Sequence, residues 1–491
     1  MTPQRKNLEV QNIAIVGSGF LGMTLALRLA KSGRRVTLFE SANEIGGLAS
    51  AWEIGDVTWD KHYHVTLASD TFTRKIVEEL GLGDEFNWVE TKTGFYTDGE
   101  LVSMSDTMEF LKFPPLGLVS KLRLGATIFY ASRVKNWKHL EKISVEKWLT
   151  RLSGKKTFEK IWKPLLQAKL GDAYNDTSAA FIWSTIQRMY AARNSGLKKE
   201  LFGYVRGGYA RILERFGEEL LENGVEIRLN SRVDSIEKLE NGKIRVAMAA
   251  ARRHRDVKPR IVAQKTKYAK FQATVAVVPG FSGAFLSEPD HRADRIVPFP
   301  RIRTDDTFDK VILTCPSNVA SKMAPQLTKA EKQDLENIRY QGIVCASVLM
   351  KCSLSRFYVT NITDEAPFTG VIEMSALVDK KEFGRKALVY LPKYVAPDDK
   401  LFEKTDEEVE HLFLNGLEKM YPHFRRKDVL AFKVSRVRQV FPLPVLNYSR
   451  DLPDMQTSID GLYVVNSSHI VNGTLNVNET IQLAENFVKD L

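Results

Sequence analysis

Near its amino terminus the chain carries a pattern of apolar residues that predicts a strand, a helix and a second strand. Asn12 to Gly17 reads Asn-Ile-Ala-Ile-Val-Gly, a short run typical of a strand buried on both faces of a parallel sheet. Apolar residues then recur at helical spacing from Phe20 to Lys31, and this helix is expected to end at Gly33. A second strand is predicted from Arg35 to Phe39, which completes a βαβ unit.

Three glycines between the predicted strand and helix have the spacing of a turn that holds a dinucleotide. Gly17, Gly19 and Gly22 form a GxGxxG motif, in which the first permits a tight turn and the second lets the backbone approach a pyrophosphate. The third brings helix and strand close together, and the helix N-terminus offers free N–H groups to the phosphates. The predicted site also includes the residues between these glycines, Ser18, Phe20 and Leu21.

An acidic residue stands where the second predicted strand ends. The carboxylate of Glu40, with Ser41 beside it, can accept hydrogen bonds from the ribose hydroxyls of adenosine. Its charge would repel a 2′-phosphate, so NADP is disfavoured. A glycine triplet between two strands, followed by this acid, indicates a dinucleotide-binding fold of the α/β class. The alternative is a βαβ unit with glycine punctuation and no ligand.

The pattern of apolar residues predicts a further helix and two further strands far downstream. A helix is predicted from Gly207 to Leu221, and a strand follows from Val225 to Val233. A further buried strand is expected from Phe308 to Pro316.

The residues after Glu40 distinguish between the possible dinucleotides. Gly46 and Gly47, followed by Leu48, resemble the second glycine motif of the flavin amine oxidase superfamily, which includes protoporphyrinogen oxidase and phytoene desaturase. In that family this turn passes the pyrophosphate and leads toward the flavin. The resemblance therefore implies FAD as the cofactor, bound to an FAD/NAD(P)-binding domain of the Rossmann type.

A second resemblance to the superfamily lies near the carboxyl terminus. Residues 460–466, 472–474 and 476–481 are similar to its closing motif, in which a strand, a loop over the flavin phosphates and a final helix follow one another. The final helix would be Ile481 to Leu491. The family usually has a Gly-Asp pair where this chain has Val465-Asn466, and no cysteine lies in the motif, so noncovalent FAD is expected. The resemblance implies cofactor contacts from Asn466, Asn472, Thr474 and Val477, with backbone near Val233 facing the adenine.

The order of these segments implies two domains. A discontinuous FAD-binding domain would combine residues 1–70, 200–320 and 455–491. An inserted α+β substrate-binding domain would combine residues 71–199 and 321–454, with a helical first part and a strand-rich second part. Residues 246–300 exceed what a strand connection needs, so we expect a basic insertion there.

Charge is concentrated in that insertion. The net charge is +11, and residues 251–270 hold eight Lys or Arg against one Asp. Such a block is usually a solvated loop, and an anionic membrane surface or acidic partner is the alternative. Nucleic acid is not an expected partner, because no recognition motif accompanies the charge. The three cysteines have neither metal-ligand nor disulfide spacing, so no metal is expected.

A cytoplasmic protein is expected, because no run of eighteen apolar residues is present to span a membrane. The stretch from Leu116 to Val134 is apolar on one side, with basic residues interspersed. It is either a surface helix packed on its own domain or an interfacial helix through which a lipid-like substrate enters from a membrane. Contact with a membrane would then be peripheral.

Candidates for chemistry lie outside the glycine motifs. The run Asp60 to His64, with Phe113–Leu116 and Ala366–Glu373, is similar to a subgroup labelled protoporphyrinogen-oxidase-like or UDP-galactopyranose-mutase-like. In an extended chain His62 and His64 would face one side, and one of them could act as a base or orient an anionic group near the flavin. A hydrogen-bonded structural role is the alternative. Candidates for substrate or anion contact, with surface solvation as the alternative, are Lys169, Arg436 and Arg438.

The resemblance thus favours an FAD-dependent oxidoreductase, an oxidase or desaturase that acts on a hydrophobic or polycyclic small molecule by hydride transfer to flavin. Flavin chemistry of this kind needs orientation and exclusion of water more than a catalytic triad, and the sequence shows none. Two alternatives remain open: a flavin-dependent nucleotide-sugar mutase similar to UDP-galactopyranose mutase, and a flavin-binding partner subunit without turnover of its own.

Overall fold

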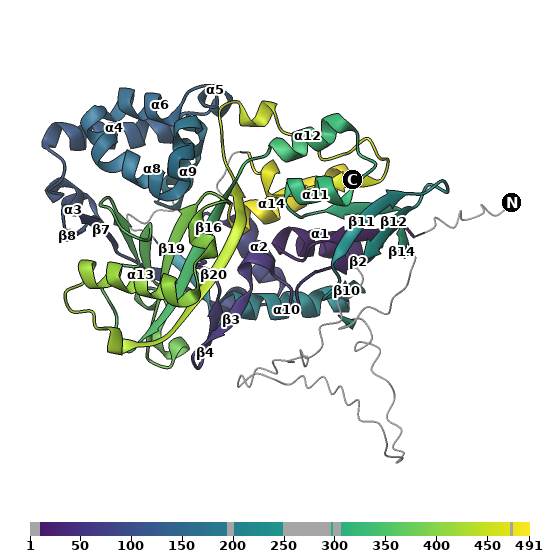
Figure 1. Ribbon diagram of the computed structural model, residues 1–491, viewed down its shortest axis with the longest axis horizontal. Coiled ribbons are helices and arrows are strands. Elements are labelled where there is room, and N and C mark those ends of the chain that lie inside the picture. Colours follow the sequence, from purple (N-terminus) through teal and green to yellow (C-terminus); the bar gives the residue numbers. More distant parts are fainter. Residues whose placement is uncertain (1–9, 194–200, 249–295, 298–305, 472–474) are drawn as a thin grey trace, which may run out of the picture.

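A six-stranded sheet with strands from both ends of the chain forms one side of the computed structural model (Figure 1). The structure describes residues 10–193, 201–248, 296–297, 306–471 and 475–491. All described pairings within this sheet are parallel. Its strands, in spatial order, are β13 (Ile296–Val297), β10 (Glu226–Arg228), β2 (Arg35–Phe39), β1 (Asn12–Val16), β15 (Lys310–Leu313) and β21 (Leu462–Val464).

Both faces of this sheet are buried, which explains why its central strands are apolar throughout. Ile13 and Ile15 of β1 pack in one cluster with α1 (Phe20–Lys31), α10 (Gly208–Glu222) and α14 (Val477–Asp490). Ala14 and Val16 point the other way and pack against a three-stranded sheet of β11 (Val233–Lys238), β12 (Ile244–Met248) and β14 (Asp306–Phe308). Successive side chains of a strand face opposite sides, so one strand serves both layers.

Two predicted strands are each divided between two sheets, and this corrects the sequence-based boundaries. The strand predicted from Val225 to Val233 ends at Arg228, because Asn230 has a positive φ of 51° that a strand does not tolerate. The chain then pairs with the end of β2 and starts β11 in the other sheet at Val233. Similarly, the strand predicted from Phe308 breaks at Asp309, whose carboxylate accepts the N–H of Asn12.

Other boundaries differ by smaller amounts. The final helix begins at Val477, one turn before the predicted Ile481, because the Asn476 side chain accepts the N–H of Glu479 and caps it there. Residues 246–248 complete β12 instead of opening an insertion. The basic run 251–270 lies outside the described residues.

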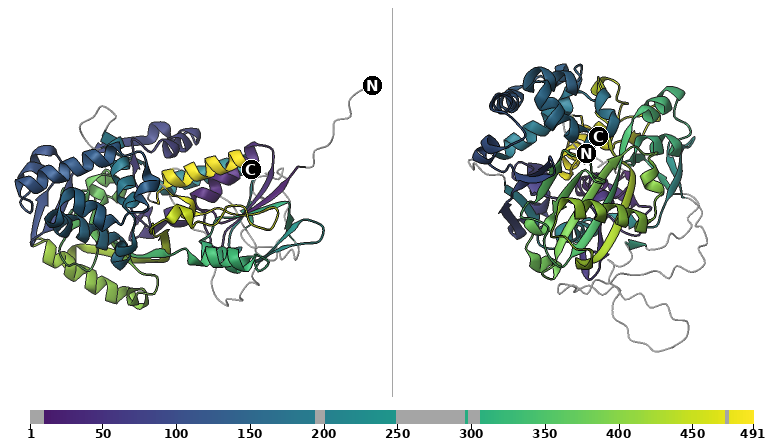
Figure 2. Two further views of the ribbon diagram at one scale, coloured as in Figure 1. Left: turned by 90° about the horizontal axis from the view of Figure 1, so that it is seen from above. Right: turned by 60° about the vertical axis from the view of Figure 1, so that its left-hand side comes forward.

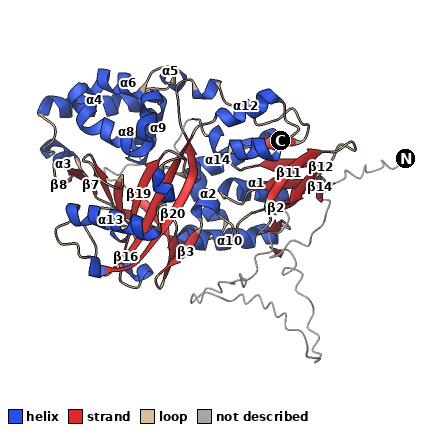
Figure 3. Cartoon of the chain, in the orientation of Figure 1, coloured by secondary structure: helices blue, strands red, loops and turns tan. Residues whose placement is uncertain are grey.

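The strand-rich second part forms a seven-stranded sheet that is covered on one face by α13 (Asp406–Met420) (Figure 3). In β16, Val344 and Ala346 pack with α13, whereas Ile343 and Cys345 pack on the opposite face toward the hairpin β3 (Ala51–Ile54) and β4 (Val57–Asp60). The strands, in spatial order, are β20 (Val429–Pro442), β16 (Tyr340–Met350), β19 (Ala387–Val395), β18 (Gly370–Glu373), β17 (Val359–Ile362), β7 (Thr93–Thr97) and β8 (Glu100–Ser103).

Helices form a separate group at the end of the molecule that lies away from the six-stranded sheet (Figure 2). They share one core that includes Trp148, Trp162 and Phe181. Their bounds are α3 (Thr107–Lys112), α4 (Leu118–Arg133), α5 (Trp137–Leu140), α6 (Val145–Ser153), α7 (Lys155–Thr157), α8 (Lys163–Leu170) and α9 (Ala179–Arg193). Two short helices, α11 (Ser317–Met323) and α12 (Lys329–Asn337), lie beside the three-stranded sheet.

Short strands and one helix connect these parts. The helix α2 (Thr71–Glu79) packs on α14, and the amide oxygen of Asn478 accepts the N–H of Phe72 at its start. A second three-stranded sheet joins β5 (Thr66–Leu67), β9 (Leu201–Val205) and β6 (Phe86–Glu90). Within the described ranges no helix is both long enough and apolar enough to cross a bilayer.

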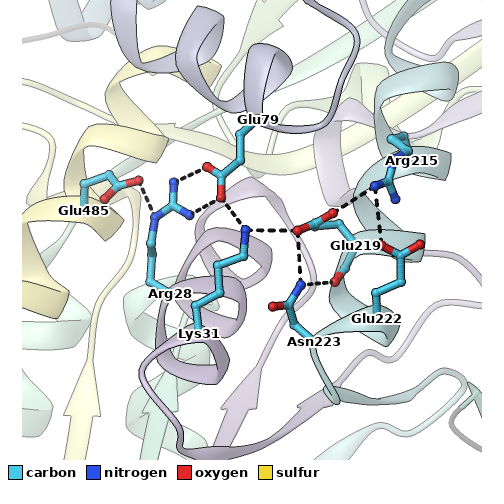
Figure 4. A network of polar contacts seen from close by, with 8 residues as sticks. All are labelled: Arg28, Lys31, Glu79, Arg215, Glu219, Glu222, Asn223 and Glu485. Carbon is cyan, nitrogen blue, oxygen red and sulfur yellow. Dashed lines mark hydrogen bonds and ion pairs between the residues drawn. The ribbon is translucent and has the colours of Figure 1, made fainter.

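An ion-pair network holds α1, α2, α10 and α14 together beside the six-stranded sheet (Figure 4). Arg28 of α1 donates two hydrogen bonds to Glu79 of α2, at 2.8 and 2.7 Å, and a third to Glu485 of α14 at 2.8 Å. Lys31 of α1 contacts both Glu79 and Glu219 of α10, at 2.6 and 2.9 Å. The hydrogen bond from Arg28 lowers the pKa of Glu79 to about 2, with a further contribution from Lys31.

Replacing Glu79 with Gln is expected to lower the free energy of unfolding by about 1 kcal/mol at pH 7, after allowance for solvent screening of these partly exposed groups. The folded-state pKa of Glu79 lies below its ordinary value of 4.5, so this stabilisation is present above pH 4.5 and is lost as the pH falls toward 2. Thermal unfolding of both proteins between pH 3 and pH 7 measures the effect. Glu78→Gln, which changes an exposed neighbour on α2, serves as the control. An equal difference between wild type and Glu79→Gln at every pH would contradict the prediction.

Candidate functional site

The first glycine turn is built so that strand, turn and helix touch. Gly17 has a φ of 109°, and its N–H donates to the carbonyl of Phe39 at 2.8 Å. A Cβ at Gly22 would lie 1.9 Å from the carbonyl oxygen of Gly17, so only glycine lets α1 approach β1 this closely. The buried side chains of Phe20 and Leu21 pack in the core beneath, so only their backbone can face a ligand.

The second glycine turn lies directly against the first. Gly46 donates its N–H to the carbonyl of Ser18 at 2.8 Å, and a Cβ at Gly47 would lie 3.2 Å from the Cα of Gly19. A Cβ at Gly19 itself would meet no atom within 4 Å. The two turns therefore form one backbone surface with open space above Gly19, at the N-terminus of α1.

Glu40 is held at the end of β2 by the first turn itself. Its carboxylate accepts the N–H and the hydroxyl of Ser18, at 2.9 and 2.7 Å, and the N–H of Ala42 at 2.8 Å. The hydroxyl of Ser41 donates to the same group at 3.1 Å. Ser18 is fully buried, so its side chain positions Glu40 and does not reach the open space. Val233 begins β11 nearby, and its side chain packs in the same cluster as Phe39.

The closing segment turns its amide side chain into the protein. The Oδ1 atom of Asn466 accepts the N–H and the hydroxyl of Ser468, and its Nδ2 donates to the Cys315 carbonyl at 2.8 Å and the Ser317 hydroxyl at 3.2 Å. All hydrogen-bonding capacity of this side chain is thereby used within the protein, and the expected contact of Asn466 with ribityl or phosphate oxygens stays a prediction. Val477 is the first residue of α14, and both Asn472 and Thr474 lie outside the described residues.

His62 connects the second glycine turn to the seven-stranded sheet. Its Nδ1 atom lies 3.1 Å from the carbonyl of Leu48, and its Nε2 atom lies 3.1 Å from the hydroxyl of Ser435 on β20. A carbonyl only accepts, so Nδ1 carries the proton and Nε2 accepts from the serine. Burial also lowers the pKa of His62. The histidine is therefore neutral with both nitrogens bonded, as in the structural alternative.

His64 has different neighbours from His62, because residues 61–65 are not a strand. Its ring lies 4.9 Å from that of Tyr209 on α10, and its Nδ1 atom, which has no hydrogen-bond partner among the described residues, lies 3.9 Å from the Asp60 carboxylate. Burial lowers the pKa of His64 to about 3 and raises that of Asp60 well above its ordinary value. His64 is thus uncharged at neutral pH. The expectation that both imidazoles face one side stays a prediction.

Tyr63, which follows His62, belongs to a cluster of aromatic side chains from different parts of the chain. The hydroxyl of Tyr63 lies 2.8 Å from that of Tyr394 on β19, and the Tyr394 ring packs edge-on to Phe441 on β20. The Nζ atom of Lys169, at the end of α8, lies 3.7 Å from the centroid of the Tyr394 ring and 5.0 Å from that of Phe441. Burial lowers the pKa of Lys169 to about 7. Lys169 is therefore not the solvated surface lysine of the alternative interpretation.

Arg436 and Arg438 do not belong to this site. Arg436 lies directly opposite Val344 in the ladder of β16 and β20, so it shares the face that α13 covers. Its guanidinium pairs with Asp406 at the start of α13, and that of Arg438 pairs with Glu403. Both guanidinium groups are thus paired with carboxylates on the face of the sheet that α13 covers, and a contact of these arginines with a substrate stays a prediction.

Comparison with known families identifies the cradle. A family model described as flavin containing amine oxidoreductase matches residues 22–260 and 300–480. The chain belongs to this family. Membership makes FAD the cofactor and places the chain among the FAD-dependent oxidoreductases.

Individual relatives are distant. A zeta-carotene desaturase from Synechocystis sp. is 25% identical over 260 residues, which cover 48% of this chain and 52% of that protein. The chain spans about half or less of the length of the curated relatives that it matches. Among solved structures, an oxidoreductase from Methanosarcina mazei has a TM-score of 0.68 at 16% identity, covering 97% of this chain and 100% of its own. Reduced UDP-galactopyranose mutase has a TM-score of 0.67 at 12% identity, covering 98% and 96%. These two likenesses show the fold, an α/β dinucleotide-binding part of Rossmann type with an inserted second part.

The cradle of this amine oxidoreductase family member fits FAD. The open space at Gly19 faces the N-terminus of α1, where the N–H groups of a helix favour phosphate. Glu40 stands at the end of β2, where Ser18 and Ser41 hold its carboxylate and a ribose hydroxyl is the expected ligand. The second turn then leads through Leu48 to His62 and the aromatic residues beyond.

Some residues of the site escaped the sequence analysis. Asp60 accepts the N–H of Tyr209 at 2.9 Å and so caps the start of α10, and Asp70 forms a two-point ion pair with Arg188 of α9. Tyr394 is placed beside Tyr63 only by the fold, since 331 residues separate them. The one available signal was Gly207-Gly208-Tyr209, a helix start that lacks a side-chain cap of its own.

Exchanging single glycines should separate cofactor binding from folding. Gly19→Ala is expected to weaken FAD binding at least tenfold, because its methyl group enters open space that the pyrophosphate needs, while the unfolding temperature of the apoprotein stays unchanged. Gly22→Ala should instead destabilise the apoprotein, because its Cβ meets the Gly17 carbonyl. The measurements are FAD released per chain after acid precipitation and thermal unfolding of the apoprotein.

Gly125→Ala, on α4 and likewise free of contacts within 4 Å, is the matched control and should retain full FAD content. Full FAD affinity in Gly19→Ala would place the pyrophosphate elsewhere.

Proposed function

We propose that the protein is an FAD-dependent oxidase or desaturase that acts on a hydrophobic or polycyclic substrate. The observation that carries this proposal is a cluster of uncharged aromatic side chains, here called the aromatic wall. It consists of Tyr63, Tyr394 and Phe441, which contact one another in series. Burial raises the pKa of Tyr63 to about 12 and that of Tyr394 well above its ordinary value, so both hydroxyls keep their protons. Such a wall favours an apolar molecule over a charged one.

The role of the chain in this reaction is to bind, orient and exclude water. FAD, when bound, would supply the chemistry by accepting a hydride, two electrons and one proton, from a substrate C–H bond. His62 holds Leu48 and Ser435 at fixed positions on either side of the site. His64, neutral and with an unpartnered Nδ1, is the better candidate for contact with a reacting group.

The proposal includes noncovalent FAD and a division of labour between two domains. Burial raises the pKa of Cys315 to about 12 and also disfavours the thiolate of Cys345, so neither thiol is disposed to attack a flavin.

Cofactor binding would fall to residues 1–70, 200–320 and 455–491, and substrate binding to residues 71–199 and 321–454. The separate hydrophobic clusters of the two sheets support this division.

The chief rival is a flavin-dependent nucleotide-sugar mutase. A nucleoside diphosphate carries at least two negative charges, so a site that binds it needs several cationic side chains. The arginines that could have supplied them, Arg436 and Arg438, are paired with carboxylates beside α13. Among the described residues, Lys169 is the cation that contacts Tyr394 and Phe441, and a single cation supports the oxidoreductase. The remaining alternative, a flavin-binding partner subunit without turnover, is distinguished from the oxidoreductase and from the mutase by adding substrates anaerobically.

Anaerobic addition of candidate substrates to the FAD-loaded protein tests the reaction class. We expect a porphyrinogen, polyene or apolar amine to bleach the flavin absorbance, and oxygen or a quinone to restore it. UDP-galactose should cause no bleaching, and UDP should not bind. Turnover of a nucleotide sugar only after chemical reduction, without net electron consumption, would favour the mutase. Stoichiometric FAD with no bleaching by any apolar substrate would favour the partner subunit.

We also propose that the helices α3 and α4 contact an anionic membrane surface. Of thirteen exposed large apolar residues among the described ones, seven lie on these two short helices. The inward face of α4 carries Leu124 and Ala131, yet Leu118, Val119 and Leu122 are 66%, 72% and 62% exposed on its other side. The exposed basic residues around this face complement anionic lipid, and they are Lys112, Arg133, Lys135 and Lys138.

Co-sedimentation with vesicles tests this surface. The protein should sediment with vesicles rich in phosphatidylserine at low salt and stay in solution with neutral vesicles, because lipid charge adds to apolar burial. A triple variant with Leu118, Val119 and Leu122 changed to Ser should lose at least tenfold in affinity while keeping its FAD. The matched control changes three exposed apolar residues elsewhere, Leu412, Leu430 and Leu446, to Ser. Absence of wild-type binding to anionic vesicles would exclude this surface contact.

A further inference from the structure

Two hydrogen-bond donors, Lys169 and Gln341, lie beside Phe441 of the aromatic wall and have no acceptor among the described residues. Lys169 forms no ion pair with a carboxylate anywhere in the described part of the chain, and its ammonium group contacts only the rings of Tyr394 and Phe441. A lysine that leaves water without gaining a counter-charge loses free energy of hydration, which is why burial alone lowers its pKa. The contact with two rings offsets only part of this cost.

Gln341 supplies the second donor. Only 2% of this residue is exposed, and its Nε2 atom has no hydrogen-bond partner among the described residues. Gln341 lies directly opposite Phe441 in the ladder of β16 and β20, so both side chains project from the same face of the sheet. That face is the one against which the end of α8 packs, since Lys169 contacts Phe441 and the amide of Gln341 lies near Gly171.

The two donors lie on the cofactor side of the sheet. Ile343 and Cys345, which follow Gln341 on the same face of β16, pack with the hairpin of β3 and β4. Lys169 touches the ring of Tyr394, whose hydroxyl bonds to Tyr63, and Tyr63 follows the histidine that holds Leu48. A short series of contacts thus leads from the second glycine turn to the donor pair.

We propose that Lys169 and Gln341 bind the carboxylate of an otherwise apolar substrate. A carboxylate has two oxygens, one for the ammonium group and one for the amide, and it brings the single negative charge that the lysine lacks. A phosphate would bring more charge than one lysine balances. The aromatic rings beside the donors then hold the apolar part of the molecule. This inference rests on the proposed function and narrows its substrate class to apolar acids.

Titration calorimetry with octanoate and with 1-octanol tests the carboxylate site directly. The FAD-loaded protein should bind octanoate, and Lys169→Met should weaken this binding at least tenfold. Gln341→Leu should weaken it several-fold, and Lys169→Arg, which keeps the charge, should retain most of the affinity. Binding of 1-octanol should be the same in all four proteins. Lys163→Met, which changes a partly exposed lysine at the start of α8 that pairs with Glu159, is the matched control and should bind octanoate like wild type.

The FAD content and unfolding temperature of each variant separate the two proposals. Equal octanoate affinity in wild type and in a folded, FAD-loaded Lys169→Met protein would overturn the carboxylate site and leave the flavoenzyme intact. Absence of octanoate binding to the wild type would overturn it as well. Loss of FAD from the wild type itself would count against the proposed function, whereas calorimetry reports octanoate binding independently of the flavin. If Lys169→Met does not fold, the comparison of Gln341→Leu with wild type decides, with equal affinity overturning the proposal.

Discussion

Direct contact between two glycine turns is the constraint on which the cofactor site depends. The helix α1 can approach β1 because Gly22 has no side chain to meet the Gly17 carbonyl, and the second turn can approach the first because Gly47 has none to meet Gly19. The hydrogen bond from Gly46 to Ser18 then fixes their relative position, and Ser18 in turn fixes Glu40. The backbone of the turns, the space where we expect phosphate and the acid that we expect to bind ribose are therefore all positioned by one small contact region. A methyl group added at Gly22 would be costly, because its Cβ would lie 1.9 Å from the Gly17 carbonyl oxygen.

The second glycine turn is also held at a fixed position relative to the seven-stranded sheet, through His62. Leu48 follows the paired glycines, and its carbonyl fixes the tautomer of His62, whose other nitrogen accepts from Ser435. This single imidazole spans the boundary between the part that holds the cofactor and the sheet that carries Tyr394 and Phe441. A protonated histidine could not accept from the serine, so its burial in the neutral form is part of how the two parts keep their register.

Local features of the chain were predictable from the sequence, whereas features that depend on distant partners were not. The first strand, helix and second strand follow from apolar spacing and glycine position, and the structure has them at the expected residues. The breaks at Asn230 and Asp309 each depend on one residue bonding or turning at a sheet edge that the sequence does not show. The face on which Arg436 lies depends on strand register, and a shift of one residue would reverse it. Asn466 resembled a ligand contact, but its partners at Cys315 and Ser317 lie about 150 residues earlier.

The helical group between β8 and β9 is attached at both of its ends to hydrogen-bonded sheets. On one side β8 pairs with β7 in the seven-stranded sheet, and on the other β9 lies between β5 and β6, while the ion pair of Arg188 with Asp70 adds a third attachment. The ion pair of Arg188 with Asp70 therefore ties α9 to the start of α2, which itself packs with the helices beside the six-stranded sheet.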